Sequence, residues 1–567
     1  MSSSTEHPAT ADAALTLIPD RGSYRVDEIV EIDILGDHDG GLLSVTHLGT
    51  AVRSIPVAPH AQRANLGALH KGGYAVEFAG ARTAVDVTSR EGERVRYAFV
   101  ADLSPHAQAQ PVTDFLRRIH ATHVQFYDWA YRHDDLVSPT EEYSDPLGLK
   151  RSLTAVRAHA QSLRTAGMSS MGYAAVYAIP ATAEARWGHA LMVNHDGIPY
   201  RLGEGFLSLT DPSDDSWKSH FYAQLRRAKV EVGLDGFHLD AYGWPKFALR
   251  QDGSVIDLAQ ALAGLVDGVA DAVPDAVYMF NNVNDFPTEA TAKSRQNATY
   301  IEVWSPHDTY GDLATLIDRA RRGAPGRPVV LAAYLSTFDT SEPEESLESA
   351  RMLMAVASSI GGSTLLLGED GHLLTGPYYA KNHELSDRHR DEFVRWYDYM
   401  VSMSDVLFDP EAVEVTEQFA GGINHDVVVV LADGSRASTK PEPGCLWLRV
   451  VRTAEGLAVH LIDLTKQRDA EWDAPKCRGG AANGVRLILT GVRSDATVLV
   501  NSPSSPQMTV ISAGDSVSFE QSDALSAAEE GLVFELPKLE TWSIVFIPWE
   551  RWVGHAANGG ARSVSIR

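Results

Sequence analysis

One unit, a short apolar run followed by an amphipathic stretch, recurs eight times in the central part of the chain. The apolar runs have the length of strands and lie at 123–129, 169–177, 205–211, 236–242, 276–282, 299–304, 328–335 and 363–368. Helical periodicity fills most of the intervals between them, for instance 153–167 and 312–323. This alternation predicts a closed (β/α)8 barrel, the TIM barrel, over residues 106–405. A doubly wound open sheet would alternate in the same way, but no GxGxxG motif opens a first strand–helix unit.

The chain is too long for one hydrophobic core. The segments on either side of the predicted barrel contain strand-like runs without helical stretches between them. Residues 1–105 contain short alternating strands separated by Gly and Asp turns, which predict an immunoglobulin-like β-sandwich. Residues 406–567 return to strand-like runs divided by Gly, Pro, Asp and Asn, which predict a second β-sandwich. The expected fold class is therefore multidomain α/β, with a central TIM barrel between two β-sandwiches.

The charge of the chain restricts its partners. There are 75 Asp and Glu against 49 Lys and Arg, a formal net charge of -26, which would repel a phosphate backbone or an anionic membrane surface. No apolar run approaches the length of about 20 residues that a membrane span needs. We therefore expect neither a nucleic acid nor a membrane as partner, whereas a neutral carbohydrate is compatible with this charge.

The sequence carries no recognisable signal for a cofactor or a metal. The two cysteines, Cys445 and Cys477, form no CxxC pair, and none of the 21 histidines lies in an HxH or HExxH motif at a strand end. No cofactor or metal is expected, which argues against a metal-dependent hydrolase. The first residues lack a basic segment followed by an apolar core, so the expected location is the cytoplasm, unless an export signal has been removed.

Acidic residues end or follow several of the predicted barrel strands: Asp128, Asp240, Glu302 and Glu369. The carboxyl ends of barrel strands carry the chemistry in this fold, so these side chains would gather at one mouth. A helix cap or a satisfied ion pair would explain any single one of them equally well. Asp240 and Glu302 are embedded in apolar runs, however, and we expect these two to face each other across the mouth as a catalytic pair.

Paired carboxyl groups are what glycoside hydrolysis requires, with one as general acid and the other as nucleophile or base. Strand alternation places His238 and Tyr242 on the same face as Asp240, where they would donate hydrogen bonds to an ionised carboxylate. Trp304 shares a face with Glu302 and would raise the pKa of that residue by excluding water. We therefore expect Asp240 to be the nucleophile and Glu302 the acid/base.

Aromatic residues cluster near the same strand ends. Aromatic rings stack on the C–H faces of sugars, while Asp, Glu, His and Asn bind sugar hydroxyl groups, so the mixture is typical of a carbohydrate cleft. Core packing explains any single aromatic residue at least as well. The residues that this pattern predicts to contact a carbohydrate are Tyr127, Trp129, Tyr177, His238, Tyr242, Trp304 and Glu369.

Seven motifs, in order along the chain, resemble glycoside hydrolase family 66, the dextranases and cycloisomaltooligosaccharide glucanotransferases. They are HVQFYDWAYRHDD, YSDPLG, GYAAVYAI, GFHLDAYG, FNNVN, YIEVW and GPYYAKN. The resemblance implies an immunoglobulin-like domain, a (β/α)8 barrel and a C-terminal Greek-key sandwich. It also implies a nucleophile at Asp240, an acid/base at Glu302, and sugar contacts from Asp128, Lys381 and Asn382.

The same resemblance implies hydrolysis of α-1,6-linked glucans, such as dextran or isomalto-oligosaccharides, with retention of configuration. Retention predicts carboxyl groups about 5 to 5.5 Å apart, against roughly 6.5 to 9.5 Å for inversion. No segment is long enough for the carbohydrate-binding module that cyclising members carry within the barrel, which favours hydrolysis over cyclisation. The lack of a visible export signal favours short oligosaccharides over polymeric dextran. Transglycosylation at the same site, and sugar binding without turnover, remain alternatives because acceptor geometry and water exclusion are three-dimensional properties.

Overall fold

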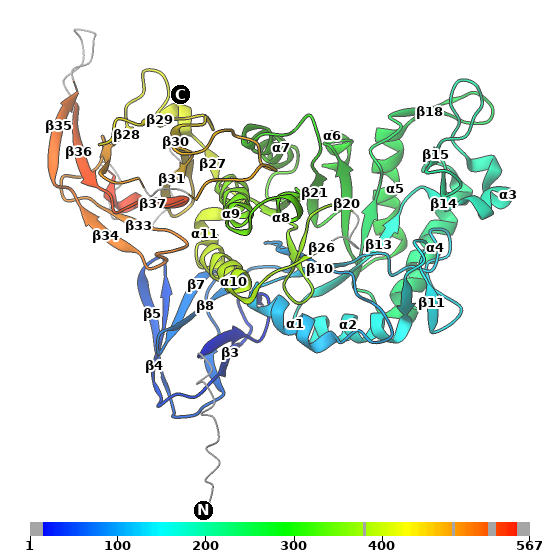
Figure 1. The fold of residues 1–567 in the computed structure, drawn as a ribbon, viewed down its shortest axis with the longest axis horizontal. Helices are drawn as coiled ribbons and strands as arrows, with labels where there is room; N and C mark the ends of the chain where they lie inside the picture. The colour runs from blue at the N-terminus through cyan, green and yellow to red at the C-terminus, as the bar shows by residue number, and fades with distance from the viewer. Residues whose placement is uncertain (1–14, 378–381, 479–481, 520–528, 553–567) are drawn as a thin grey trace, which may run out of the picture.

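The computed structural model describes residues 15–377, 382–478, 482–519 and 529–552. Figure 1 shows three parts along the chain: N-terminal sheets in blue, a central assembly of strands and helices in cyan and green, and C-terminal sheets in yellow to red. The N-terminal sheets pack on α10 (Asp387–Ser402), and the C-terminal sheets pack on α9 (Pro343–Ser359). Both flanking parts therefore lie on the same side of the central assembly.

Two sheets form the N-terminal part. In β3 the buried side chains of Val30, Ile32 and Ile34 alternate with less buried acidic residues, so one face of the strand enters the core. The strands are β1 (Thr16–Pro19), β3 (Val30–Leu35) and β6 (Arg63–Gly67) in one sheet, and β2 (Tyr24–Arg25), β8 (Ala81–Thr88), β7 (Gly72–Phe78), β4 (Gly41–His47) and β5 (Thr50–Val57) in the other. They share one apolar core. The immunoglobulin-like class of this part stays a prediction.

The central part is built on parallel strands whose side chains are buried almost throughout, as expected for strands covered on both faces. Neighbouring strands in this sheet also follow one another in the chain. In order they are β9 (Tyr97–Val100), β10 (His123–Phe126), β13 (Ser169–Ala175), β17 (Gly236–Asp240), β20 (Val277–Val283), β21 (Ala298–Glu302), β22 (Val329–Ala332), β23 (Gly362–Thr364) and β24 (Leu367–Gly368).

The last two strands of this series join its ends. β23 pairs with β22, and β24, which follows after two residues, pairs in parallel with β9. The segment 362–368 therefore acts as one interrupted strand between the last and the first members of the sheet. The core is barrel-like, with its carboxyl strand ends gathered at one mouth. An antiparallel extension, β25 (His372–Leu374) and β26 (Asn382–Glu384), continues from β24.

Two of the predicted strand placements were wrong. The run at 97–100 was expected in the N-terminal sandwich, but it pairs in parallel with β10 and is the first central strand. The run at 205–211 was expected in the barrel, but β16 (Leu207–Leu209) pairs antiparallel with β14 (Ala178–Pro180) and β15 (Arg201–Leu202) in a separate small sheet. Local apolar patterning predicts that a strand forms, whereas its partner is chosen by the tertiary packing.

Helices follow the central strands and end at recognisable signals. Asp214 caps the N-terminus of α4 and Gly233 ends it in the left-handed conformation, while Thr309 and Asp312 form a capping box on α7. The helices are α1 (Ala109–Arg118), α2 (Leu153–Thr165), α4 (Asp215–Val232), α5 (Leu258–Ala272), α6 (Thr288–Thr291), α7 (Tyr310–Gly323), α9 and α10. Shorter elements at the mouth include α3 (Glu184–Trp187), α8 (Thr337–Thr340), β18 (Phe247–Leu249) and β19 (Val255–Asp257).

The C-terminal part contains two further sheets with a shared apolar core. The larger has β27 (Val413–Glu414), β30 (Cys445–Arg452), β31 (Gly456–Asp463), β37 (Trp542–Pro548), β33 (Thr497–Asn501), β34 (Thr509–Ser512) and β29 (Arg436–Ser438). The smaller has β28 (Val427–Leu431), β32 (Val485–Leu489), β36 (Glu529–Glu535) and β35 (Asp515–Phe519). Its Greek-key connectivity stays a prediction. Trp542 of β37 stacks on Trp396 of α10 at 6.1 Å and meets Tyr399 edge-on, so the core continues across this junction.

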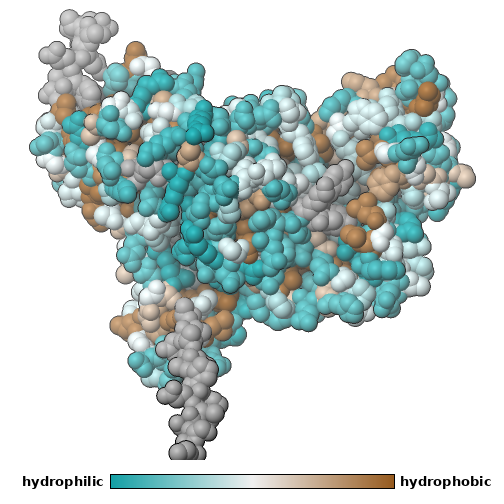
Figure 2. Space-filling model, viewed as in Figure 1, coloured by the Kyte–Doolittle hydropathy of each residue, from teal (hydrophilic) through white to brown (hydrophobic). Residues whose placement is uncertain are grey.

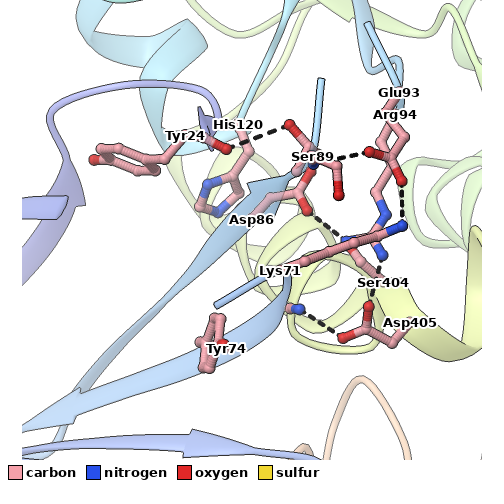
Figure 3. A network of polar contacts seen from close by, with 12 residues as sticks. Tyr24, Lys71, Tyr74, Asp86, Ser89, Glu93, Arg94, His120, Ser404 and Asp405 are labelled. Carbon is pink, nitrogen blue, oxygen red and sulfur yellow. Dashed lines mark hydrogen bonds and ion pairs between the residues drawn. The ribbon is translucent and has the colours of Figure 1, made fainter. Parts of the chain in front are cut away.

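A buried ionic network fixes the N-terminal part to the central part (Figure 3). Asp86 of β8 accepts hydrogen bonds from Arg94 and Arg96, each at 2.7 Å. Arg94 also donates to Asp405 of α11 (Ser404–Leu407) at 2.6 Å, and the Gly73 amide of β7 and the His47 ring bind the other oxygen of Asp405. These hydrogen bonds hold the pKa of Asp405 well below its usual value, against the opposing effect of burial. The network compensates the burial of its charges only while every partner is present.

Replacing Asp405 with Asn should therefore destabilise the protein by about 3 to 5 kcal/mol, because Arg94 would keep its buried charge and lose one of its anions. Since the carboxyl pKa is depressed in the fold, this stabilisation is present above the pKa of an unfolded aspartate, about 3.9, and is lost as the pH falls through the folded value. Urea unfolding followed by fluorescence measures the effect, with the exposed Asp27→Asn as control. Equal midpoints for the two variants would contradict it.

The described surface is mainly polar. Figure 2 shows a largely hydrophilic face on which hydrophobic residues lie in small separate groups. Of the helices described, none combines the length and apolarity needed to cross a bilayer. Within the same residues, no group of three or more His, Cys, Asp or Glu side chains is placed to hold a metal ion.

Candidate active site

Asp240 and Glu302, the last residues of β17 and β21, are joined through one amide on the strand between them. Asn281 of β20 donates a hydrogen bond from Nδ2 to Asp240 Oδ1 at 2.7 Å and to Glu302 Oε2 at 2.8 Å. Two bonds of these lengths from one nitrogen place the bonded carboxylate oxygens no more than 5.5 Å apart. The sequence-based expectation that these two side chains meet at one mouth agrees with this geometry.

A tyrosine hydroxyl holds the second oxygen of each carboxylate. Tyr173 of β13 donates to Asp240 Oδ2 at 2.8 Å, and Tyr334, which follows β22, donates to Glu302 Oε1 at 3.2 Å. Each carboxylate therefore accepts one amide and one phenol hydrogen bond, from strands on both of its sides. This fixes the orientation of both groups before any substrate arrives.

His238 does not bind Asp240, contrary to the expectation from strand alternation. Its Nδ1 lies 3.0 Å from the Tyr97 hydroxyl on the far side of the barrel interior. Burial lowers the pKa of His238 to about 3, so the ring is neutral in the physiological range. Asp240 instead accepts hydrogen bonds from Tyr173 and Asn281 on the neighbouring strands, because residues within one strand share a face without their polar ends meeting.

Burial raises the pKa of both acids above the ordinary value of a carboxyl group. It raises the pKa of Asp240 to about 7, with the charge of Glu302 adding to the effect and the hydrogen bonds from Asn281 and Tyr173 opposing it. Burial likewise raises the pKa of Glu302, against hydrogen bonds from Asn281 and Tyr334. Two carboxylates this close do not ionise independently, so the pair retains a proton near neutral pH.

The sequence predicted that Trp304 would raise the pKa of Glu302 by excluding water; burial does raise that pKa, and Trp304 adds an opposing hydrogen bond. The indole itself is 38% exposed. It lines an adjoining hollow of about 500 Å³ that shares Tyr334 and Pro377 with the carboxylate cavity.

The two carboxylates open into a cavity of about 270 Å³ with mixed aromatic and polar walls. Four of the residues predicted from sequence to contact a carbohydrate line it: Tyr127, Asp128, His238 and Tyr242. Its walls also contain residues that were not predicted: Gln125, His133, Tyr173, Asn281, Tyr300 and Tyr334. Asp128 directly follows Tyr127 after the end of β10 and has a positive φ of 37°, which directs the chain away from the strand at the mouth.

Trp129 and Tyr177 do not line this cavity, which corrects their predicted role. Trp129 is fully buried, and its indole donates to the Tyr173 carbonyl at 3.1 Å. A Cβ at position 172 would lie 2.8 Å from the same indole nitrogen, so Gly172 allows this close packing. The Tyr177 hydroxyl accepts from the Tyr242 amide and donates to the Trp244 carbonyl. Both side chains position the residues that do line the cavity.

Glu369 and Asn382 also lie away from the cavity walls. Glu369 is buried, accepts a hydrogen bond from the Ala101 amide at 2.9 Å, and bonds Asn382 at 3.5 Å. Burial raises the pKa of Glu369 to about 7. These contacts tie the loop after β24 to the loop after β9, so they stabilise the pairing of β24 with β9 that joins the two ends of the central sheet. Lys381 lies outside the described residues.

Three buried polar atoms of the cavity wall have no hydrogen-bond partner within the described part of the chain: Gln125 Oε1, His133 Nδ1 and Asn281 Oδ1. Sequence reasoning missed all three residues as ligands. The available signal was a polar side chain inside an apolar strand, as with Gln125 in HVQF and Asn281 in VYMFNNV. Buried polar groups need partners, so these atoms can bind the hydroxyl groups of a ligand.

The family model described as "Glycosyl hydrolase family 66" matches residues 73–546. A cycloisomaltooligosaccharide glucanotransferase of Niallia circulans is 24% identical over 297 residues, which are 48% of this chain and 31% of that protein. A dextranase of Streptococcus salivarius is 23% identical over 155 residues, 24% of this chain and 19% of the dextranase. The matched regions thus cover a third or less of the curated relatives' length.

Among solved structures, a Paenibacillus sp. cycloisomaltooligosaccharide glucanotransferase complexed with cycloisomaltoheptaose superposes with a TM-score of 0.82. It is 17% identical, and the alignment covers 94% of this chain and 100% of that chain. At this identity the likeness concerns the fold, and it agrees with the three-part architecture described above. With the family model extending over most of the sequence, the conclusion is that this chain belongs to glycosyl hydrolase family 66.

Proposed function

We propose that the protein is a retaining glycoside hydrolase that cleaves α-1,6-glucosidic linkages. The observation that carries the proposal is the Asn281 bridge, which holds oxygens of Asp240 and Glu302 within 5.5 Å. This bound is compatible with the separation of about 5 to 5.5 Å typical of retention and lies below the roughly 6.5 to 9.5 Å typical of inversion, so it supports a retaining mechanism.

In the proposed reaction Asp240 attacks the anomeric carbon while Glu302 protonates the departing glycosidic oxygen. The covalent glycosyl–Asp240 intermediate is then hydrolysed by a water molecule that gives its proton to Glu302. The single proton that the pair retains near neutral pH must reside on Glu302 in the productive state.

The cavity walls support a carbohydrate as the substrate. Tyr127 and Tyr242 offer aromatic surface for sugar C–H faces, and the unpartnered atoms of Gln125, His133 and Asn281 offer sites for hydroxyl groups. The relatives named above support an α-1,6-linked glucan. We propose Asp128, at the cavity edge, as a further ligand of a sugar hydroxyl group.

The product anomer tests the mechanism directly. Wild-type protein is incubated with isomaltotriose and the first released sugar is followed by ¹H NMR before mutarotation. We expect the α-anomer, because two displacements restore the starting configuration. Release of the β-anomer would leave the carboxylates in place but reject the covalent intermediate.

The same incubations separate the alternatives. Comparing isomaltose, isomaltotriose, longer isomalto-oligosaccharides and dextran, we expect turnover to favour the short substrates; a strong preference for dextran would refute this. Longer or cyclic products from isomalto-oligosaccharides would show transglycosylation, in which a sugar hydroxyl replaces water at the second step. Binding of the sugars with no turnover of any of them would identify a binding protein.

A further inference from the structure

The hollow of about 500 Å³ beside Trp304 lies next to the carboxylate cavity and shares Tyr334 and Pro377 with it. Its wall begins with residues 303–305, which directly follow Glu302 in the chain. None of the described residues that line it adjoins the other carboxylate in the chain. The hollow therefore lies on the Glu302 side of the pair, and we call it the adjoining hollow.

The proposed reaction fixes which part of a substrate lies toward this hollow. The nucleophile attacks the anomeric carbon, and the acid/base protonates the glycosidic oxygen on the side of the departing sugar. Tyr334, which lines both spaces, donates a hydrogen bond to Glu302 Oε1 at 3.2 Å, so the passage between them runs beside the acid/base. The sugar units that leave in the first step therefore lie toward the adjoining hollow.

One wall of the adjoining hollow comes from the C-terminal part of the molecule. It is formed by residues 471–473, in the connection between β31 and β32, which we call the C-terminal segment. Trp472 is buried and anchors this segment to the loop that follows β21. Its indole donates to the His307 carbonyl at 2.7 Å, and its amide donates to the Asp308 carbonyl at 3.0 Å.

Further contacts fix the same connection to the barrel. Asp473 accepts a hydrogen bond from Ser336 Oγ, in the loop after β22, at 2.8 Å. The buried Lys476 forms an ion pair with Asp469 and lies 5.5 Å from the centre of the Tyr310 ring. The C-terminal segment is therefore held in place before a substrate binds, and preorganisation of this kind reduces the entropy that binding costs.

The wall offers groups that bind a glucan chain. Trp304 is partly exposed and lies 5.8 Å from the Tyr334 ring, so its indole provides an aromatic surface for sugar C–H faces. Asp308 accepts a hydrogen bond from Ser305 Oγ at 3.0 Å, which orients its carboxylate. Glu471 is exposed, and its side chain bonds no described residue, so its carboxylate can accept hydrogen bonds from sugar hydroxyl groups.

We infer, on the basis of the function proposed above, that the C-terminal segment completes the binding site for the departing glucosyl units. Trp304 provides the stacking surface of this site and Glu471 a ligand for hydroxyl groups. The same site holds an acceptor sugar in the second step. A hydroxyl group of that acceptor attacks the anomeric carbon of the intermediate and gives its proton to Glu302, while the bond to Asp240 breaks. Occupancy of the adjoining hollow thus decides between hydrolysis and transfer.

α-Isomaltosyl fluoride tests this role, because fluoride needs no sugar-binding site when it leaves. Fluoride release measures the first step, and formation of isomaltotetraose after addition of isomaltose measures transfer. In the wild type we expect transfer to saturate with isomaltose. In Glu471→Ala the isomaltose concentration for half-maximal transfer should rise about fivefold, the effect of one net hydrogen bond. The KM for isomaltotriose should rise similarly relative to the KM for the fluoride.

Matched variants separate binding from other effects. Glu411→Ala removes an exposed acid elsewhere in the C-terminal part and should change neither constant. Trp304→Phe keeps an aromatic face and Trp304→Ala does not, while neither can donate a hydrogen bond to Glu302. The difference between these two variants therefore isolates stacking. Acceptor binding should be about threefold to tenfold weaker in Trp304→Ala than in Trp304→Phe.

Unchanged acceptor binding in Glu471→Ala, or an equal loss in Glu411→Ala, would overturn the role of the C-terminal segment. Equal acceptor binding in the two Trp304 variants would overturn the stacking surface. Fluoride release without any transfer to isomaltose would overturn the acceptor site while leaving the proposed hydrolysis in place. If the wild type released neither fluoride from the fluoride substrate nor glucose from isomaltotriose, the proposed function itself would be rejected, and the acceptor site with it.

Discussion

Asp240→Ala should reduce the turnover of isomaltotriose on the order of 10⁴-fold or more, since no other group can then form the glycosyl–enzyme bond. The strand should keep its geometry, because Asp240 is the last residue of β17 and is only partly buried. Initial rates of glucose release measure the effect. Glu91→Gln, an exposed acid just before β9, is the matched control and should retain full activity.

Restoring the activity of Asp240→Ala with azide would show that the variant is folded and that its loss of activity comes from the missing nucleophile. With an aryl α-glucoside or aryl α-isomaltoside, azide should enter the space left by the missing carboxylate and attack the anomeric carbon, forming a C–N bond as the phenolate leaves. A single displacement inverts the configuration, so the product should be the β-glycosyl azide, identified by NMR. Near-full activity of Asp240→Ala without azide, or rescue with retention, would show that Asp240 is not the nucleophile.

Glu302→Gln should lower turnover of isomaltotriose by about 10²- to 10⁴-fold, the usual contribution of a general acid. Release of a good leaving group such as dinitrophenolate needs no proton, so the first step with such a substrate should be nearly unaffected. Azide should then accelerate the second step, because an anion needs no general base, and should give the α-glycosyl azide. The opposite anomers from the two variants distinguish the roles of the two acids in one assay.

The pH profile of the same variant provides a further readout. In the wild type, kcat/KM should fall as the pH rises through about 7, where the last proton leaves the carboxyl pair. In Glu302→Gln this alkaline limb should vanish with the activated substrate. The acidic limb should move to lower pH, because the amide no longer carries the charge that raises the pKa of Asp240. An unchanged profile would place the ionisation on another group.

Much of the candidate site could be predicted because strand ends are visible in a sequence. Asp240 and Glu302 each close an apolar run, and in a parallel barrel such positions share one mouth. Asn281 was missed as the bridging group because its role depends on lying between two partners on adjacent strands, 41 and 21 residues away in the chain. The same limit explains Trp129 and Tyr177, whose residue type suits a sugar cleft equally well whether they line it or support it from behind.

The alternation of short apolar runs with amphipathic helices, and the family motifs along them, already determined that this chain has a parallel α/β core with acids at its mouth. Periodicity is a local property, and each strand or helix must present an apolar face whatever its partner. Only the tertiary structure decided that residues 97–100 open the central sheet, that residues 207–209 leave it, and that one asparagine joins the two acids. Those outcomes depend on which backbone edges and side chains meet across long stretches of chain, and that choice is made by packing the whole core.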